Sequence, residues 1–119
     1  MIHLFQPPGS KLCGQTCVAM LAGVTLEESV RVFGRKGGTN TKQVAEALGK
    51  LGIKSGDRLV RPKFLDELPS CCIAKIHFTD AKNTHWTVYR DGLYYDPAYG
   101  IYEFPPEYMR VTSYLPVYL

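Results

Sequence analysis

One cysteine of the chain stands where a predicted loop meets an apolar segment. Cys13 is followed by Gly14, and residues 13–21 are apolar nearly throughout, which predicts a buried helix that starts at Cys13. A thiol at a helix N-terminus lies at the positive end of the helix macrodipole, and this position favours the thiolate. A thiolate attacks carbonyl carbon atoms when a histidine serves as its proton partner. The residue types therefore indicate nucleophilic acyl chemistry.

A histidine and an aspartate that could complete such a site flank a predicted hairpin. The pair Asp91-Gly92 is a strong signal for a two-residue turn between two strands. In that register His85 and Asp96 lie diagonally across one face of the hairpin, roughly 7 Å apart at the backbone. Asp96 can then hold one ring nitrogen of His85 while the other nitrogen faces the thiolate. The hairpin thus predicts a hydrogen-bonded His–Asp pair.

Each candidate also has a structural interpretation when it is taken alone. A cysteine near a helix start is more often a small buried apolar residue than a nucleophile, and Cys17, one turn further along, is interpreted in that way. An aspartate before a proline, as at Asp96, commonly starts a turn. His3 and His77 are interpreted as structural or exposed. The case for catalysis therefore depends on the combination and its order, Gln, Cys, His and Asp.

That combination resembles the papain-like cysteine peptidases. It is most similar to the compact bacterial branch that includes the double-glycine leader (bacteriocin-processing) peptidases, and the resemblance covers nearly the whole chain. The matching segments are Gln6, Cys13-Gly-Gln-Thr-Cys17-Val-Ala-Met20, His85-Trp-Thr-Val88 and Tyr95-Asp96-Pro97.

The resemblance implies a role for each matching residue. Cys13 would be the nucleophile, His85 the general base and acid, and Asp96 the residue that orients His85. Gln6 would donate to the oxyanion, with the backbone N–H of Cys13 as the second donor. Family members usually have this glutamine six residues before the cysteine, whereas Gln6 lies seven before Cys13, so the intervening loop must bulge. If it does not, Gln15 is the next candidate for the donor.

Three functional alternatives share these residues. The first is a peptidase or isopeptidase that acts on a peptide or protein substrate. The second is an acyl or amide transferase, or a deamidase, which differs in the nucleophile that resolves the acyl-enzyme. The third is a non-catalytic binding or accessory module on the same fold, because a fold does not fix a function.

Composition sets the remaining expectations. The 119 residues, of which 45% are apolar and 21% charged, predict a single domain over residues 1–119. The net charge of +3 comes without a basic run, so no nucleic-acid partner is expected, and no apolar run is long enough for a membrane span. The four cysteines are not spaced as a disulfide framework or a zinc site, and residues 1–6 lack the features of a secretory signal. We expect a cytoplasmic protein with no cofactor or metal; its oligomeric state stays open.

The pattern along the chain predicts helices first and strands second. Thr25 with Glu28 and Asn40 with Gln43 are predicted to cap two further helices. A short edge strand or a lead-in segment is predicted over residues 2–5. Later strands are predicted over 53–60, 71–78, 86–90, 93–96, 101–102 and 110–119, the last interrupted at Pro116. A short element is predicted over residues 64–68. This order is typical of an α+β fold, papain-like by resemblance, with N-terminal helices packed on a C-terminal antiparallel sheet.

Overall fold

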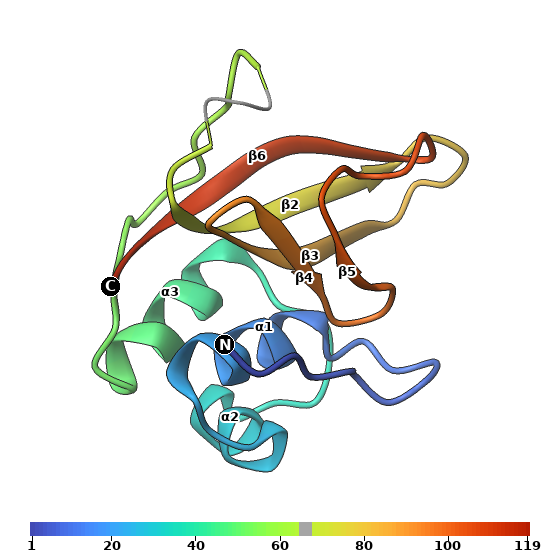
Figure 1. Ribbon diagram of the computed structural model, residues 1–119. Coiled ribbons are helices and arrows are strands. Elements are labelled where there is room, and N and C mark those ends of the chain that lie inside the picture. The colour runs from blue at the N-terminus through green and yellow to red at the C-terminus, as the bar shows by residue number, and fades with distance from the viewer. Residues whose placement is uncertain (65–67) are drawn as a thin grey trace.

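The fold is α+β, with all three helices preceding the six strands of the sheet, as the sequence predicts (Figure 1). The computed structural model describes residues 1–64 and 68–119, so most of the short element predicted over residues 64–68 lies outside the described residues. The helices are α1 (Cys13–Ala22), α2 (Leu26–Phe33) and α3 (Thr41–Lys50). The strands are β1 (Lys54–Ser55), β2 (Cys71–Phe78), β3 (Thr84–Arg90), β4 (Leu93–Asp96), β5 (Gly100–Tyr102) and β6 (Met109–Tyr118).

The helix termini follow the predicted capping signals. The Thr25 hydroxyl accepts the backbone N–H of Glu28 at the start of α2. At α3, Asn40 and Gln43 form a reciprocal capping box, with both hydrogen bonds at 2.9 Å. Gly23 ends α1 with a positive φ of 68°, a conformation that glycine adopts without a steric penalty. The three helices therefore begin and end close to where local chemistry predicts.

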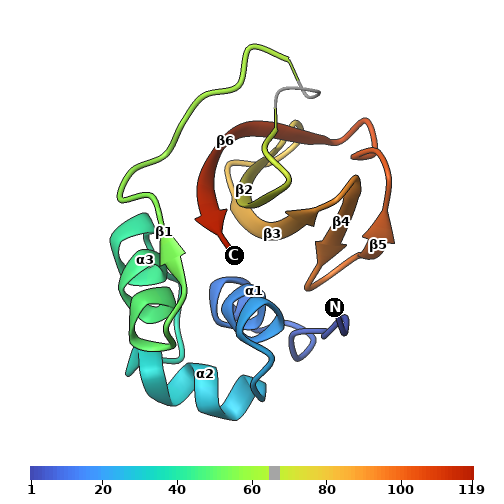
Figure 2. The same cartoon turned by 60° about the vertical axis from the view of Figure 1, so that its left-hand side comes forward.

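The sheet is antiparallel and curves strongly, with the strand order β1-β6-β2-β3-β4-β5 (Figure 2). Helix α1 lies against this sheet, and α2 and α3 pack beside α1 (Figures 1 and 2). Every residue of α1 from Gly14 to Leu21 is buried, which matches its apolar sequence. The main core joins α1 and α3 to β2, β3 and β6. The close packing of the apolar residues in this core holds the start of α1 in a fixed position against the sheet.

The β3–β4 hairpin has the predicted register. Arg90 pairs with Leu93, and Val88 pairs with Tyr95. The turn residues Asp91 and Gly92 have φ values of 49° and 89°, as a tight turn with two left-handed residues requires. The hairpin prediction on which the His–Asp pair depends is therefore confirmed.

Two predictions about strands are wrong. Residues 53–60 form only the two-residue β1 and an isolated bridge from Val60 to Tyr114. Of the two alternatives for residues 2–5, the structure has a lead-in segment and no strand. Pro116 does not interrupt β6, which continues to Tyr118. The backbone carbonyl of Pro116 accepts the N–H of Gly56, the residue that follows β1. Proline has no N–H to return this hydrogen bond, and β1 pairs with β6 only at Lys54 and Ser55. The missing donor therefore lies where the pairing of these two strands ends.

Among the described residues, no helix is both long and apolar enough to cross a membrane.

Candidate active site

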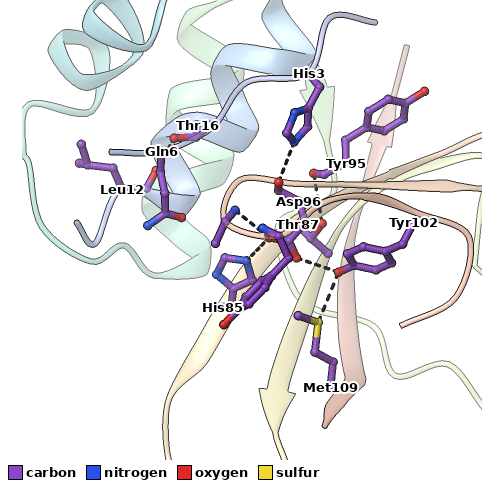
Figure 3. A network of polar contacts seen from close by, with 12 residues as sticks. His3, Gln6, Leu12, Thr16, His85, Thr87, Tyr95, Asp96, Tyr102 and Met109 are labelled. Carbon is purple, nitrogen blue, oxygen red and sulfur yellow. Dashed lines mark hydrogen bonds and ion pairs between the residues drawn. The ribbon is translucent and has the colours of Figure 1, made fainter. Parts of the chain in front are cut away.

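His85 and Asp96 are joined by a short hydrogen bond. The distance from His85 Nε2 to Asp96 Oδ1 is 2.7 Å (Figure 3). His85 is near the start of β3 and Asp96 ends β4, so the hairpin brings together residues that are 11 apart in sequence. His85 is 7% exposed and Asp96 is fully buried. A buried pair of this kind is oriented by its neighbours and not by solvent.

Asp96 is held at both carboxylate oxygens. Oδ1 also accepts the backbone N–H groups of Ala98 at 2.9 Å and Tyr99 at 3.1 Å, which form a turn after the strand. Oδ2 accepts the hydroxyl of Tyr102 at 2.7 Å (Figure 3). Asp96 is therefore both a turn starter, as its position before Pro97 indicates, and the partner of His85.

The electrostatics of the pair favour an imidazolium beside a carboxylate. Burial on its own would lower the pKa of His85, but hydrogen bonds to Asp96 and Cys13 outweigh burial and raise that pKa to about 9. Burial on its own would raise the pKa of Asp96, yet the hydrogen bond and charge of His85, with the Tyr102 hydroxyl, hold it below its usual value. At neutral pH the His85 ring therefore carries a proton and a positive charge.

The Cys13 thiol is the second hydrogen-bonding partner of the His85 ring. Because Nε2 is occupied by Asp96, Nδ1 is the ring nitrogen left for the sulfur. Cys13 is the first residue of α1, and no side chain of the described residues caps that helix end. The first backbone N–H groups of α1 therefore have no capping side chain as a partner, and they form the positive end of the helix dipole. A thiolate at Cys13 would be stabilised by both the helix end and the imidazolium.

Close packing fixes the start of α1 against β3. A Cβ atom at position 14 would collide with the Thr39 hydroxyl and would come within 3.4 Å of the Trp86 ring. Glycine is thus required here because a loop and a strand approach the helix backbone. The Trp86 indole N–H, next to His85 in sequence, donates to the Thr39 carbonyl at 3.4 Å. This packing sets the separation between the thiol and the imidazole.

Gln6 reaches the same cleft as Cys13 by means of the predicted bulge. The N–H of Ser10 donates to the Pro7 carbonyl at 3.0 Å, and Gly9 has a φ of 73°, so residues 7–10 form a tight turn. The backbone N–H of Gln6 donates to the Pro97 carbonyl at 2.8 Å, which ties this segment to the residue after Asp96. Figure 3 shows the Gln6 side chain directed toward the His85 side of the network, and both residues line the cleft.

The two amide groups of Gln6 and Gln15 are used differently. Gln6 Nε2 donates to the Ser10 carbonyl at 2.8 Å and to the Ser10 hydroxyl at 3.4 Å, and Gln6 Oε1 is buried without a partner among the described residues. Gln15 is fully buried, and its Nε2 donates to the carbonyls of Arg35 and Gly37. Gln15 thus holds the loop after α2 in place and does not line the cleft. Gln6 therefore stays the candidate oxyanion donor.

The cleft around these groups has a volume of about 500 Å³. Phe78 and Tyr99 flank the His85 ring, each with its ring centroid 5.9 Å from that of His85. The sequence analysis did not single out these two aromatic residues or Tyr102. Tyr102 reaches Asp96 because Asp96 pairs with Gly100 in a β4–β5 hairpin, and the sequence around Pro97 did not indicate that strand pairing.

The remaining thiols differ from Cys13 in their surroundings. All four cysteines lie among the described residues and are free, but Cys17, Cys71 and Cys72 are buried. Burial raises the pKa of Cys17 well above its usual value and that of Cys72 to about 12. The described residues contain no group of three or more histidine, cysteine or acidic side chains that could hold a metal ion.

Neither a protein-family model nor a curated protein matches this chain.

Proposed function

We propose that this protein is a papain-like cysteine peptidase that hydrolyses a peptide or isopeptide bond through Cys13, His85 and Asp96. The observation that carries the proposal is that one buried histidine contacts both a carboxylate and a thiol at a helix N-terminus. A perturbed histidine in a cleft, with a nucleophile on one side and an orienting acid on the other, is typical of acyl-transfer sites.

In the acylation step, the Cys13 thiolate attacks the carbonyl carbon of the substrate, and a carbon–sulfur bond forms. The carbon–nitrogen bond then breaks, and the leaving amine takes the proton that His85 carries. His85 is protonated at neutral pH because of Asp96 and Cys13, so it begins this step in the form that can act as the acid. The products are a thioester on Cys13 and a free amine.

In the deacylation step, the neutral His85 takes a proton from water as the oxygen attacks the thioester carbon. The carbon–sulfur bond breaks, which releases a carboxylic acid and restores the thiolate and the imidazolium. In both steps negative charge develops on the carbonyl oxygen, where the backbone N–H of Cys13 and the side-chain amide of Gln6 would donate, the latter in place of its contact with the Ser10 hydroxyl. Asp96 does not exchange a proton; it holds the ring and stabilises its positive charge.

Two alternatives use the same residues. A transferase or deamidase follows the acylation step described above but differs in the acceptor or in the amide that is attacked. A non-catalytic binding or accessory module is the second alternative, and the observation that supports it is that the Gln6 amide already donates to Ser10. Four free thiols fit the cytoplasmic location that we propose.

Cleavage of a fluorescence-quenched peptide library by the purified protein tests the proposal. We expect turnover by the wild-type protein, none by Cys13→Ala, and retained turnover by Cys71→Ala, which is a matched change at a buried thiol outside the cleft. Mass spectrometry of the products separates hydrolysis from amine transfer. No turnover of any library member by a folded wild-type protein would contradict the peptidase proposal.

A further inference from the structure

A second hollow of the molecule is strongly basic. It has a volume of about 710 Å³ and lies over β2 and β6 beside the loop that follows β1. Five cationic or protonatable side chains line it, and we call this hollow the basic groove: Arg61, Lys63, Lys75, His77 and Arg110. The described residues that line this hollow include no carboxylate, and the hydroxyl of Ser113 adds a hydrogen-bond donor.

The basic groove adjoins the active-site cleft through two rows of paired residues. His77 pairs with Arg110 on one side and with Thr84 on the other, so these three project from the same face of the sheet. In the other row, Lys75 pairs with Ser113 and with Trp86. Thr84 and Trp86 also line the active-site cleft. Each row crosses two strand spacings, so the far side of the basic groove lies about 10 Å from the wall of the cleft.

Lys75 marks the boundary between the two hollows. Its Nζ lies 5.4 Å from the centroid of the Trp86 ring, a cation–π contact that holds the ammonium group beside the cleft wall. Lys11 and Lys82 line the cleft itself, and no carboxylate is among the described residues that line it. Positive charge therefore extends from the mouth of the cleft into the basic groove, and such a field attracts anionic ligands.

We propose that the basic groove binds an acidic segment of the substrate polypeptide, which extends out of the active-site cleft. The inference rests on the proposed peptidase function. An extended chain advances about 3.3 Å per residue, so about three residues of a substrate span the distance from the cleft wall to the far side of the groove. Aspartate and glutamate are the side chains that pair with arginine and lysine there. The shared wall at Thr84 and Trp86 favours a peptide substrate over an unrelated polyanion.

Binding of two matched peptides by the Cys13→Ala protein tests the inference without any need for cleavage. The probes are a fluorescent twelve-residue peptide with three adjacent glutamates and the same peptide with three glutamines, measured by anisotropy. Exposed ion pairs are individually weak, so we expect a combined preference of about tenfold for the glutamate peptide, smaller at high salt. In Lys75→Gln/Arg110→Gln the ratio should fall to about one. Lys42→Gln/Lys50→Gln on α3 removes the same charge away from the groove and should keep the ratio.

The outcomes separate the two proposals. If the wild-type protein cleaves no library peptide but the Cys13→Ala protein binds the glutamate peptide through Lys75 and Arg110, the peptidase proposal fails and the basic groove remains an acidic-peptide site. If peptides are cleaved but glutamate and glutamine peptides bind equally well, the groove inference is overturned. A single-stranded oligonucleotide of equal charge that binds more tightly than the glutamate peptide at physiological salt would also overturn it.

Discussion

The protonation state of His85 depends on the charge of Asp96, and Asp96→Asn removes that charge with little change in shape. In the structure, Asp96 Oδ1 accepts His85 Nε2 at 2.7 Å and two backbone N–H groups. An asparagine oxygen can keep these three contacts, while its amide nitrogen can donate to the hydroxyl oxygen of Tyr102. The fold is therefore expected to survive, so the variant tests electrostatics and not packing.

The size of the effect follows from the pKa of His85. That pKa lies at about 9 against an ordinary 6.5, although burial opposes the charged form. At 1.36 kcal/mol per unit, the partners favour the imidazolium by about 3 kcal/mol. Without the carboxylate, burial remains and Cys13 is the main support for the proton. We expect the pKa of His85 to fall by about 2 units in Asp96→Asn.

An NMR titration of the histidine ring protons between pH 5 and 10 measures this shift. The chain has three histidines, so a His85→Gln spectrum assigns the signal. A value near 9 in the wild-type protein and about 2 units lower in Asp96→Asn supports the reasoning. A wild-type value below 7, or the same value in both proteins, refutes it.

The same shift predicts a dependence of stability on pH. The pKa of His85 is higher in the folded protein than in the unfolded chain, so its stabilising contribution is fully present below pH 6.5 and is lost as the pH rises through about 9. Between pH 6 and 9.5, the free energy of unfolding of the wild-type protein should fall by about 3 kcal/mol more than that of Asp96→Asn. Urea unfolding at the two pH values measures the difference.

Three further predictions concern the remaining members of the site. Gln6→Ala should lower kcat by roughly 10²-fold with a smaller change in KM, because an oxyanion donor acts only as charge develops; steady-state kinetics with a cleaved library peptide measures both, and unchanged turnover would remove Gln6 from the site. Asp96→Ala should lower turnover less than Cys13→Ala or His85→Ala, because Asp96 orients the ring while the other two make bonds and move protons; equal losses with an intact fold would show that Asp96 does more. Tyr102→Phe removes the hydroxyl that donates to Asp96 Oδ2 and should shift the acidic limb of the rate profile to higher pH, because the pKa of Asp96 loses a group that holds it down; an unchanged profile would make Tyr102 a packing residue only.

Local sequence signals predicted the parts of the site that depend on short-range geometry. The Asp91-Gly92 turn fixed the hairpin register, which in turn brings His85 to Asp96. Capping residues placed the starts of α2 and α3 for the same reason, since a cap acts on the next few residues only. The apolar run after Cys13 placed the thiol at a helix end.

Features that depend on tertiary packing could not be predicted from the sequence. Tyr102 reaches Asp96 only through the β4–β5 pairing, and residues 53–60 lack a neighbouring strand for most of their length. The basic groove joins residues from β2, β6 and the loop after β1, and no sequence run of basic residues marks it. Side-chain clusters assembled from distant segments become visible only when the strand order is known.

The central claim is that Cys13 is a nucleophile activated by His85, and the rate of its alkylation tests that claim most directly. The purified protein is treated briefly with iodoacetamide between pH 5 and 9, and the modified cysteine is identified by mass spectrometry. We predict fast labelling of Cys13 alone at pH 6, and a much slower rate at that pH in His85→Ala, because the thiolate then loses its imidazolium partner. Cys17, Cys71 and Cys72 should stay unmodified in the folded protein because all three are buried. Preferential labelling of Cys17, or a Cys13 rate at pH 6 that His85→Ala leaves unchanged, would contradict the account.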